Sequence, residues 1–385
     1  MQYRTYGKLG YDVSLLGIGC MRLPKIFDGT DKAQVDREKA YEMLRYAADN
    51  GITYFDTAWG YHHQTSEEVL GEALAEGGRR AKVKIATKQP LMAMPQQSDI
   101  RKNLENTLKK LRTDYIDVYI IHNIMPATWE TVQQRKLIAE WEAFKREGLI
   151  KAIGFSYHGH AQCFNEILGH YDWDMCLIQQ NVIDVENQAG EQGIIEAGKK
   201  GCALVIMEPL RGGGIASPTK AVKALYDGHP VKRSAVDWAF RHLINYPQVS
   251  CILSGMSTLE QLKENIALFS APDALPHCLT KADKALLARV REAYLAVRSI
   301  PCTGCEYCLP CSSGVQIPAI FANYNDGVSF ENFNQCRRAY MFTTAAKQDA
   351  SRCVECGDCL EKCPQRIDIP ARLKEAHEKL KGWIE

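Results

Sequence analysis

The fold is decided by Ile52-Thr-Tyr-Phe-Asp-Thr-Ala-Trp-Gly-Tyr61, a short apolar run that ends in an acid and a turn. Its first half is rich in aromatic and β-branched residues, which is typical of a buried strand. The strand should stop at Asp56, and Gly60 should turn the chain before Tyr61. The pattern therefore places an acid and a tyrosine at the same end of a predicted sheet.

Two later stretches have the same form, each a short apolar strand followed by a polar residue. Residues 83–87 precede Lys88, and residues 115–121 precede His122. In parallel barrels, catalytic side chains gather at the carboxyl ends of several strands. We therefore expect Lys88 and His122 to join Asp56 at one end of such a barrel.

These motifs resemble the aldo-keto reductase family over roughly the first 270 residues. The matching positions are Asp56 and Tyr61 (in Asp-Thr-Ala-x-x-Tyr), Lys88 (in Ile-Ala-Thr-Lys) and His122 (in Ile-Ile-His-Asn). The resemblance implies that these four residues are the catalytic tetrad of an NAD(P)-dependent oxidoreductase. Such an enzyme transfers hydride between nicotinamide and a carbonyl or alcohol, with Tyr61 as general acid and base.

The chemistry of these four residues suits the donation of a proton to a developing alkoxide. A free tyrosine has a pKa of about 10 and is a poor acid at neutral pH. We expect the ammonium of Lys88 to favour the phenolate of Tyr61 and to lower its pKa. Asp56 should hold Lys88 charged and oriented, and His122 should hydrogen-bond the substrate oxygen. A positioned acid of this kind contributes about 10²- to 10⁴-fold to the rate.

The family resemblance also implies which residues contact the nicotinamide cofactor. They are Ser156, Gln179, Asn181, Glu208, Leu210, Gly212, Gly213, Ser254, Ser257, Gln261, Glu264 and Asn265. Three positions depart from the family pattern. Tyr157 occupies the position of an asparagine that binds the carboxamide, and Gly255 and Gln261 occupy the positions of cations that bind the 2′-phosphate. We therefore expect NADH to be used at least as well as NADPH.

Strands and helices alternate through the first part of the chain, which favours a (β/α)8 TIM barrel over residues 1–275. A hairpin from Tyr3 to Leu16 should precede it, and in the family such a hairpin closes the bottom of the barrel. The predicted strands are residues 17–21, 52–56, 83–87, 115–121, 150–155, 176–179, 203–207 and 249–253. A doubly wound dinucleotide fold would need Gly-x-Gly-x-x-Gly after the first strand. The third glycine is missing there, so we reject that fold.

Cysteines mark a second domain at residues 301–385, which a helix within residues 276–300 connects to the barrel. Of the fifteen cysteines, six are scattered before residue 279 and nine follow residue 300. Eight of those nine form two motifs of closely spaced thiols. The motifs are Cys302-x-x-Cys305-x-x-Cys308-x-x-Cys311 and Cys353-x-x-Cys356-x-x-Cys359-x-x-x-Cys363-Pro364.

The second cysteine motif matches the bacterial ferredoxin run, in which the fourth cysteine ligates the other cluster. This pattern predicts two [4Fe–4S] clusters, with Cys363 completing the first triplet and Cys311 completing the second. The first motif departs from the run because two residues, not three, precede Cys311, and Pro310 comes before it. Zinc is the alternative, but zinc sites do not need a third close cysteine. The helical spacing between the motifs suggests a mainly α-helical, ferredoxin-like domain.

Composition places the chain among ordinary globular proteins. It has 385 residues, a net charge of +1 and 24% charged residues, which implies neither nucleic-acid nor membrane partners. The N-terminus lacks a signal-peptide core, so we expect a cytoplasmic protein. Its partners should be a small carbonyl or alcohol substrate and a ferredoxin-like redox protein. Two alternatives remain: an electron-transfer module that links nicotinamide to such a partner, and a nicotinamide sensor with structural clusters.

Overall fold

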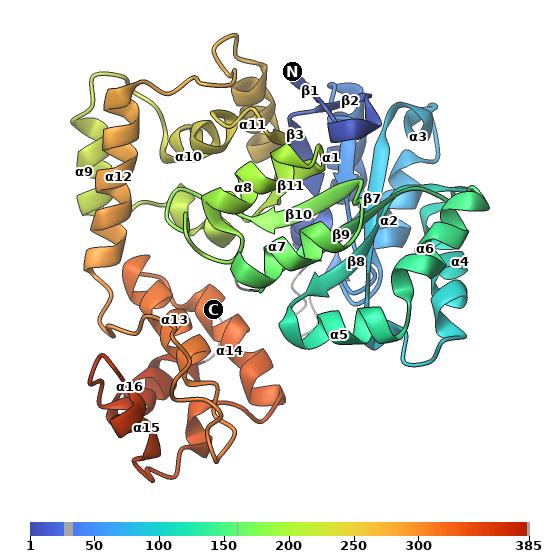
Figure 1. The fold of residues 1–385 in the computed structure, drawn as a ribbon. Helices are drawn as coiled ribbons and strands as arrows, with labels where there is room; N and C mark the ends of the chain where they lie inside the picture. The colour runs from blue at the N-terminus through green and yellow to red at the C-terminus, as the bar shows by residue number, and fades with distance from the viewer. Residues whose placement is uncertain (27–33, 160, 383–385) are drawn as a thin grey trace. The chain divides into compact units, whose positions relative to one another are not determined.

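The structure is a computed structural model that describes residues 1–26, 34–159 and 161–382. The chain divides into two compact units (Figure 1). One unit is Met1–Pro209 with Ala239–Thr280, and the other is Leu210–Trp238 with Lys281–Glu385. The predicted boundaries at residues 275 and 300 stay a prediction, and residues 383–385 of the predicted second domain lie outside the described part.

The first unit is a closed eight-stranded parallel barrel, as predicted. Around the barrel the strand order is β10-β11-β12-β3-β6-β7-β8-β9. The strands are β3 (Leu16–Gly19), β6 (Tyr54–Asp56), β7 (Lys84–Pro90), β8 (Ile116–Ile124), β9 (Ile150–Tyr157), β10 (Met175–Gln179), β11 (Ala203–Met207) and β12 (Val249–Ser254). The predicted strand 17–21 ends earlier, at Gly19, because residues 20–22 form a 3₁₀ turn. A small antiparallel pair, β4 (Lys25–Ile26) and β5 (Gln34–Val35), follows this turn.

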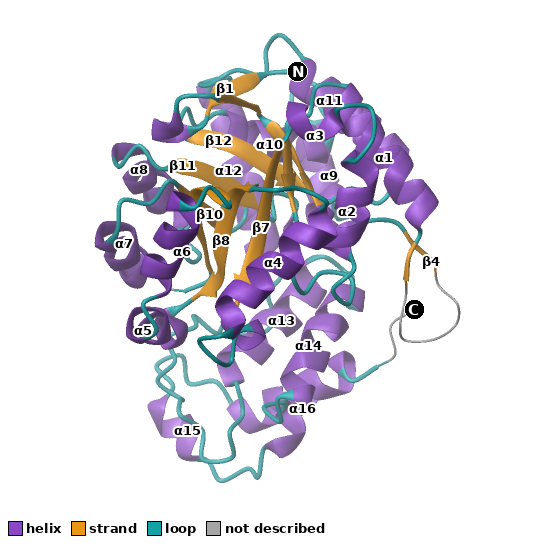
Figure 2. Ribbon diagram, turned by 90° about the vertical axis from the view of Figure 1, so that its right-hand side faces the viewer, coloured by secondary structure: helices purple, strands orange, loops and turns teal. Residues whose placement is uncertain are grey.

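Amphipathic helices surround these strands (Figure 2). In α4, the residues that pack inward are Ile100, Leu104, Thr107 and Leu111, at the three- and four-residue spacing of one helix face. The helices are α1 (Arg37–Asp49), α2 (Ser66–Leu74), α3 (Arg79–Lys82), α4 (Asp99–Leu111), α5 (Pro126–Gln134), α6 (Leu137–Arg146), α7 (Ala161–His170), α8 (Gly190–Lys199) and α11 (Leu259–Ser270). A further helix, α10 (Ala235–Ile244), spans the division between the two units.

An N-terminal hairpin packs against the interior of the barrel. It consists of β1 (Tyr3–Thr5) and β2 (Asp12–Ser14), which pair antiparallel. Tyr6 follows β1, and its hydroxyl lies 2.9 Å from the hydroxyl of Tyr54 on β6. Both tyrosines are fully buried among apolar strand residues such as Val118 and Val205. The hairpin therefore fills the end of the barrel opposite the carboxyl ends of the strands.

The second unit is mainly helical, in agreement with the prediction. It contains α9 (Lys220–Asp227), α12 (Lys281–Ala296), α13 (Ile317–Ser329), α14 (Asn334–Ala345), α15 (Asp358–Lys362) and α16 (Ile369–Leu380). Figure 1 shows α9 beside α12. The apolar core between α13, α14 and α16 includes Phe321, Tyr340 and Leu373, and six of the clustered cysteines pack against it. Among the described residues, no helix is both long and apolar enough to cross a bilayer.

Candidate active site

The tetrad residues come from neighbouring strands of the barrel. Asp56 ends β6, Lys88 lies in β7 and His122 lies in β8, while Tyr61 follows β6 on a turn. The Lys88 Nζ donates hydrogen bonds to the Asp56 carboxylate, to the Thr57 carbonyl oxygen at 2.8 Å and to the Tyr61 hydroxyl at 3.2 Å. The structure thus brings Asp56, Lys88 and Tyr61 into direct contact.

Backbone hydrogen bonds fix the turn that carries Tyr61. Trp59 N–H donates to the Lys88 carbonyl at 3.0 Å, which continues the β6–β7 pairing past Asp56. Tyr61 N–H donates to Ala58, and the Tyr61 carbonyl accepts from Gln64 at 3.0 Å. The three residues after Tyr61 all have positive φ, an uncommon conformation for residues other than glycine. This compact turn holds the phenol beside Lys88.

His122 completes the group from the next strand. Its ring centroid lies 6.2 Å from that of Tyr61, with the two rings nearly perpendicular at 81°. Burial, assisted by the nearby charge of Lys88, lowers the pKa of His122 to about 3. Its buried Nδ1 has no hydrogen-bond partner among the described residues. A neutral imidazole beside the tyrosine can donate to, or accept from, a substrate oxygen.

The electrostatics of Lys88 and Tyr61 follow from the loss of solvent around the two side chains. Lys88 is only 1% exposed, and burial works against its charge. Asp56 and Tyr61 outweigh that effect, so the pKa of Lys88 is raised and the ammonium persists. Burial also raises the pKa of Tyr61, and the opposing effect of Lys88 is smaller. The expected net lowering of the Tyr61 pKa is therefore wrong for this structure, because desolvation of the phenolate exceeds the attraction of the ammonium.

His158 is a further residue at this end of the barrel that the sequence analysis missed. It directly follows β9, and its backbone N–H donates to the Ile124 carbonyl at 3.0 Å. Burial and the charge of Lys88 lower its pKa to about 4, and His158 in turn contributes to the lowered pKa of His122. Its spacing from Ser156 could have revealed it. Side chains alternate along a strand, so a residue two positions beyond Ser156 is expected on the same face as Ser156.

Cys20 also lies next to the tetrad. It is fully buried, and burial raises the pKa of its thiol well above the usual range. Its carbonyl oxygen accepts a hydrogen bond from His62 Nε2 at 3.0 Å and another from Ser66 Oγ at 3.4 Å. Since a fully buried thiol resists ionisation, Cys20 has the properties of a packing residue.

Gln179 and Asn181 lie at the end of β10 and share one partner, Asp184. Gln179 Nε2 and Asn181 Nδ2 donate to the same carboxylate oxygen, Oδ2, of Asp184 at 2.9 and 3.0 Å. Asn187 Nδ2 donates to Gln179 Oε1 at 3.1 Å. Asn181 Nδ2 also reaches the Glu208 carbonyl at 3.3 Å. The sequence analysis missed Asp184, which orients both amides that the resemblance assigns to the cofactor.

Ser156 and Ser254 occupy comparable positions at the ends of two other strands. Ser156 in β9 is fully buried, and its hydroxyl oxygen accepts from the backbone N–H of Asn123 at 2.8 Å. This bond holds the chain immediately after His122. Ser254 ends β12, and its hydroxyl accepts from Asn265 Nδ2 of α11 at 3.1 Å. Both serines thus sit in fixed positions at the carboxyl ends of barrel strands.

The start of α11 contains the residues expected to contact adenosine. Ser257 N–H donates to Gln261 Oε1 at 2.9 Å, and Ser257 Oγ donates to the Arg22 carbonyl at 2.8 Å. Glu264 lies on the exposed side of the same helix. A Cβ on Gly255 would lie only 3.1 Å from Arg22 Cδ. The aliphatic part of the Arg22 side chain therefore packs against position 255, where the family has a cation.

The remaining predicted cofactor residues follow β11. Glu208 belongs to the barrel unit and has a positive φ of 55°. Leu210, Gly212 and Gly213 belong to the helical unit, where Leu210 precedes the kinked 3₁₀ segment Arg211–Ala216 and the two glycines lie inside it. Gly212 and Gly213 have φ values of 66° and 100°, which explains why glycine is needed at both positions.

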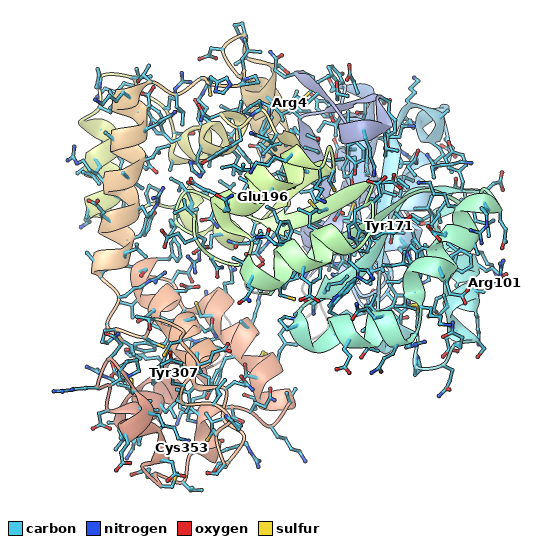
Figure 3. The ribbon with its side chains drawn as sticks, viewed as in Figure 1. Arg4, Arg101, Tyr171, Glu196, Tyr307 and Cys353 are labelled. Atoms are coloured by element: carbon cyan, nitrogen blue, oxygen red, sulfur yellow. The ribbon has the colours of Figure 1, made fainter. Side chains whose placement is uncertain are left out.

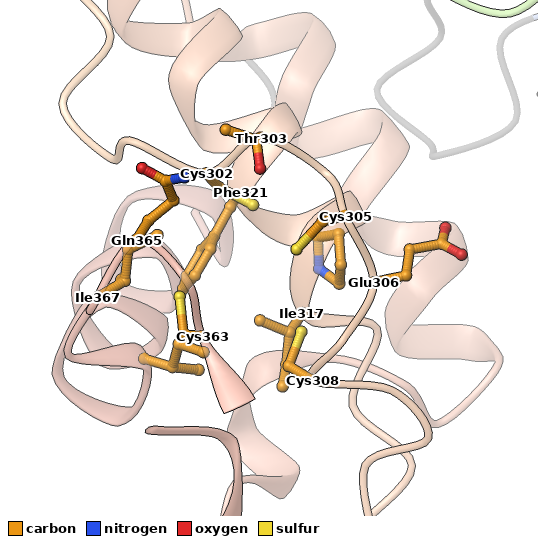
Figure 4. Close-up of a pocket in the computed structure, with 12 residues that line it drawn as sticks. Cys302, Thr303, Cys305, Glu306, Cys308, Ile317, Phe321, Cys363, Gln365 and Ile367 are labelled. Atoms are coloured by element: carbon orange, nitrogen blue, oxygen red, sulfur yellow. The ribbon is translucent and has the colours of Figure 1, made fainter. Parts of the chain in front are cut away.

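The eight clustered cysteines line two pockets of the helical unit. The first pocket, shown in Figure 4, is lined by Cys302, Cys305, Cys308 and Cys363, together with apolar residues such as Phe321. The second is lined by Cys308, Cys311, Cys353, Cys356 and Cys359. Figure 3 labels Tyr307 on the first cysteine segment and Cys353 on the second. The structure therefore gathers Cys363 with the first triplet and Cys311 with the second.

A closed parallel barrel with a Lys–Tyr pair at its strand ends defines an α/β-barrel protein with a candidate site at this rim. The second unit adds two pockets, each lined by at least four cysteines together with other residues. The chain belongs to the aldo/keto reductase family of oxidoreductases, whose model matches residues 15–275. A model described as a 4Fe-4S dicluster domain matches residues 301–367.

A curated relative agrees with the family assignment, and two solved structures share the barrel fold. The uncharacterised oxidoreductase YrpG of Bacillus subtilis is 30% identical over 291 residues, which cover 70% of this chain and 82% of YrpG. The aldo-keto reductase AKR11C1 of Bacillus halodurans superimposes with a TM-score of 0.62 at 24% identity, covering 75% of this chain and 96% of the other. An aldo/keto reductase of Klebsiella pneumoniae, solved with NADP and acetate, has a TM-score of 0.60 at 18% identity and covers 76% and 96%.

Proposed function

We propose that the protein is a nicotinamide-dependent carbonyl reductase or alcohol dehydrogenase with Tyr61 as general acid and base. The observation that carries this proposal is the buried Lys88, which hydrogen-bonds Asp56 and Tyr61 at once. Burying a lysine this deeply would be costly without a charged partner, and a buried ionisable group with a specific charge partner is a candidate for a functional site.

Each residue of the tetrad has a separate task. Lys88 stabilises the phenolate that forms when Tyr61 gives its proton to the substrate oxygen. Asp56 keeps Lys88 charged, and the Thr57 carbonyl fixes its orientation. His122, neutral because it is buried, donates a hydrogen bond to the same oxygen. Bound nicotinamide would supply or accept the hydride.

The ends of β9, β10 and β12 supply the cofactor contacts in this proposal. Ser156 and Gln179 would bind the carboxamide, whereas Ser254 and Asn265 would hold the adenosine end. The amide nitrogen of Gln180, next to Gln179, is buried without a hydrogen-bond partner among the described residues, as expected where a polar ligand completes the site. The NADP complex of the Klebsiella pneumoniae relative supports the same class of cofactor.

We propose that the two cysteine pockets hold two [4Fe–4S] clusters with crossed ligation. Cys302, Cys305, Cys308 and Cys363 would hold one cluster, and Cys311, Cys353, Cys356 and Cys359 the other. The donor set fits, because each pocket is lined by the four thiols of one set together with apolar residues such as Ile317. Bound clusters would carry single electrons. Reduced thiols suit the cytoplasm, and all fifteen cysteines are free in this structure.

A second candidate function is electron transfer between nicotinamide and a ferredoxin-like partner. It is favoured by Cys308 and Ile317, which line both cysteine pockets, because clusters bound in these pockets would lie close together. The difficulty is that hydride carries two electrons and a cluster carries one, a mismatch that a flavin usually bridges. Nicotinamide sensing with purely structural clusters is the third candidate, and it predicts no turnover.

The test is an anaerobic preparation with its visible spectrum followed during addition of NADPH or NADH. Oxidation of the reduced cofactor that depends on a simple aldehyde supports the reductase. Bleaching of cluster absorbance by the reduced cofactor, without any aldehyde, supports electron transfer. Binding of the cofactor with neither effect supports sensing and contradicts the proposed reductase.

A further inference from the structure

The Asn181 side chain holds the turn that follows β10. Its Oδ1 accepts from the backbone N–H groups of Ile183 and Asp184, at 2.9 and 3.0 Å. Its Nδ2 donates to Asp184 Oδ2 at 3.0 Å and to the Glu208 carbonyl at 3.3 Å. An amide side chain has two donor hydrogens and two acceptor lone pairs, and these four bonds use all of them. The fully buried Asn181 therefore shapes the turn and has no hydrogen-bonding capacity left for a ligand.

Gln179, at the end of β10, keeps part of its hydrogen-bonding capacity. Its Nε2 donates to Asp184 Oδ2 at 2.9 Å, and its Oε1 accepts from Asn187 Nδ2 at 3.1 Å. Among the described residues, these bonds use two of the four positions of the amide. Gln179 is only 3% exposed, so little water reaches the other two. One N–H and one lone pair of Gln179 are therefore available to a ligand.

Asp184 decides which way round the Gln179 amide lies. A carboxylate oxygen accepts hydrogen bonds and cannot donate them, so the Gln179 atom that faces it must be the nitrogen. Asn187 does not decide this, because an amide can present either its oxygen or its nitrogen to Gln179. Asp184 is 8% exposed, so solvent competes weakly for its carboxylate. The acceptor Oε1 is therefore held on the arm of the Gln179 amide that does not face Asp184.

We propose that Asp184 is a positioning residue of the nicotinamide site, which orients Gln179 so that its Oε1 accepts a hydrogen bond from the amino group of the cofactor carboxamide. The inference rests on the proposed function, because it takes Gln179 as a carboxamide contact. All residues of this network belong to the barrel unit. A reversed Gln179 amide would set N–H against N–H, and this bond would not form. Asp184 thereby selects a ring that carries a primary carboxamide.

The experiment compares two dinucleotides on the full chain, purified anaerobically. They are NAD⁺ and acetylpyridine adenine dinucleotide, in which a methyl group replaces the amino group of the carboxamide. We expect wild type to bind NAD⁺ about tenfold more tightly, because the analogue leaves the buried Oε1 of Gln179 unpaired. In Asp184→Ala the ratio of the two dissociation constants should fall to about two or less, since the amide is then free to reverse. ADP-ribose, which lacks the nicotinamide ring, should bind equally to wild type and to Asp184→Ala.

Three further variants serve as controls. Asp184→Asn keeps the shape of the side chain with a single accepting oxygen, so its ratio should lie between those of wild type and Asp184→Ala. Asp114→Asn, at an exposed carboxylate before the start of β8, should keep the wild-type ratio. Gln179→Ala should lose the discrimination by itself. If Asp184 acts through Gln179, adding Asp184→Ala to Gln179→Ala should not change the ratio further.

The outcomes separate this inference from the proposed function. An unchanged ratio in Asp184→Ala overturns the inference, and Asp184→Asn decides in the same way if the alanine variant does not fold. Equal weakening of NAD⁺, the analogue and ADP-ribose would show a structural role only and also overturns it. Wild type that binds both dinucleotides equally overturns the inference alone. Wild type that binds neither dinucleotide overturns the proposed function and this inference together.

Discussion

Acidification should destabilise the barrel through two partly buried histidines near Lys88, His122 and His158. Burial lowers the pKa of His122 to about 3 and that of His158 to about 4, from 6.5 for a free imidazole. The unfolded chain therefore binds protons that the folded chain does not. The free energy of unfolding should fall as pH drops below 6.5 and level off near the folded values.

The size of the effect follows from the gap between the pKa values. At pH 5 a free histidine is almost fully protonated while both buried rings stay neutral. At about 1.4 kcal/mol per pKa unit, each ring then destabilises the fold by roughly 2 kcal/mol relative to pH 7. This is a large part of the stability of a typical domain.

Urea unfolding followed by tryptophan fluorescence at pH 7 and pH 5 measures this dependence. His158→Gln should lose about 2 kcal/mol less than wild type over that range, because the glutamine does not titrate. His277→Gln, at an exposed position, is the control and should behave as wild type. An identical pH dependence in wild type and His158→Gln would refute the argument that this ring is held neutral by burial.

Two further predictions concern the metal and cofactor sites. Cys363→Ala should damage the cluster held by the first cysteine triplet, and Cys311→Ala the cluster held by the second. Anaerobic preparations should contain about eight irons in wild type, and reduced samples should lose a different EPR signal in each variant; bound zinc with almost no iron would contradict both assignments. NADH should support a kcat/KM at least equal to that of NADPH, because Gly255 and Gln261 carry no cation. A strong NADPH preference that Arg22→Ala abolishes would show instead that Arg22 binds the 2′-phosphate.

The sequence predicted the barrel and the positions of the tetrad because both depend on local signals. Each strand is a short apolar run that stops at a polar residue, and the ends of parallel strands meet at one rim. Asp56 and Lys88 could therefore be placed together without knowledge of their distance. The grouping of Cys363 with the first triplet likewise agrees with the spacing of the ferredoxin run.

What the sequence could not supply depends on tertiary packing. Whether the Tyr61 pKa is raised or lowered depends on how far the phenol is removed from solvent. The residues next to Tyr61 in the chain do not predict that burial. Asp184 lies in an irregular segment whose bonds to Gln179 form only when that segment folds back on the end of β10. The ion pair between Arg211 and Asp326 joins residues that are 115 positions apart in the chain. No local sequence pattern predicts such a contact.

The most direct test of the proposed mechanism is Tyr61→Phe. This change removes the phenolic proton donor and keeps the aromatic ring that packs beside Lys88. Carbonyl reduction at saturating cofactor should fall about 10²- to 10⁴-fold, the contribution of a positioned general acid. The dissociation constant for the dinucleotide should stay close to that of wild type, because Tyr61 is not among the proposed cofactor contacts. A variant that keeps more than about a tenth of wild-type turnover would contradict the assignment of Tyr61 as the acid, and with it the role given to Lys88.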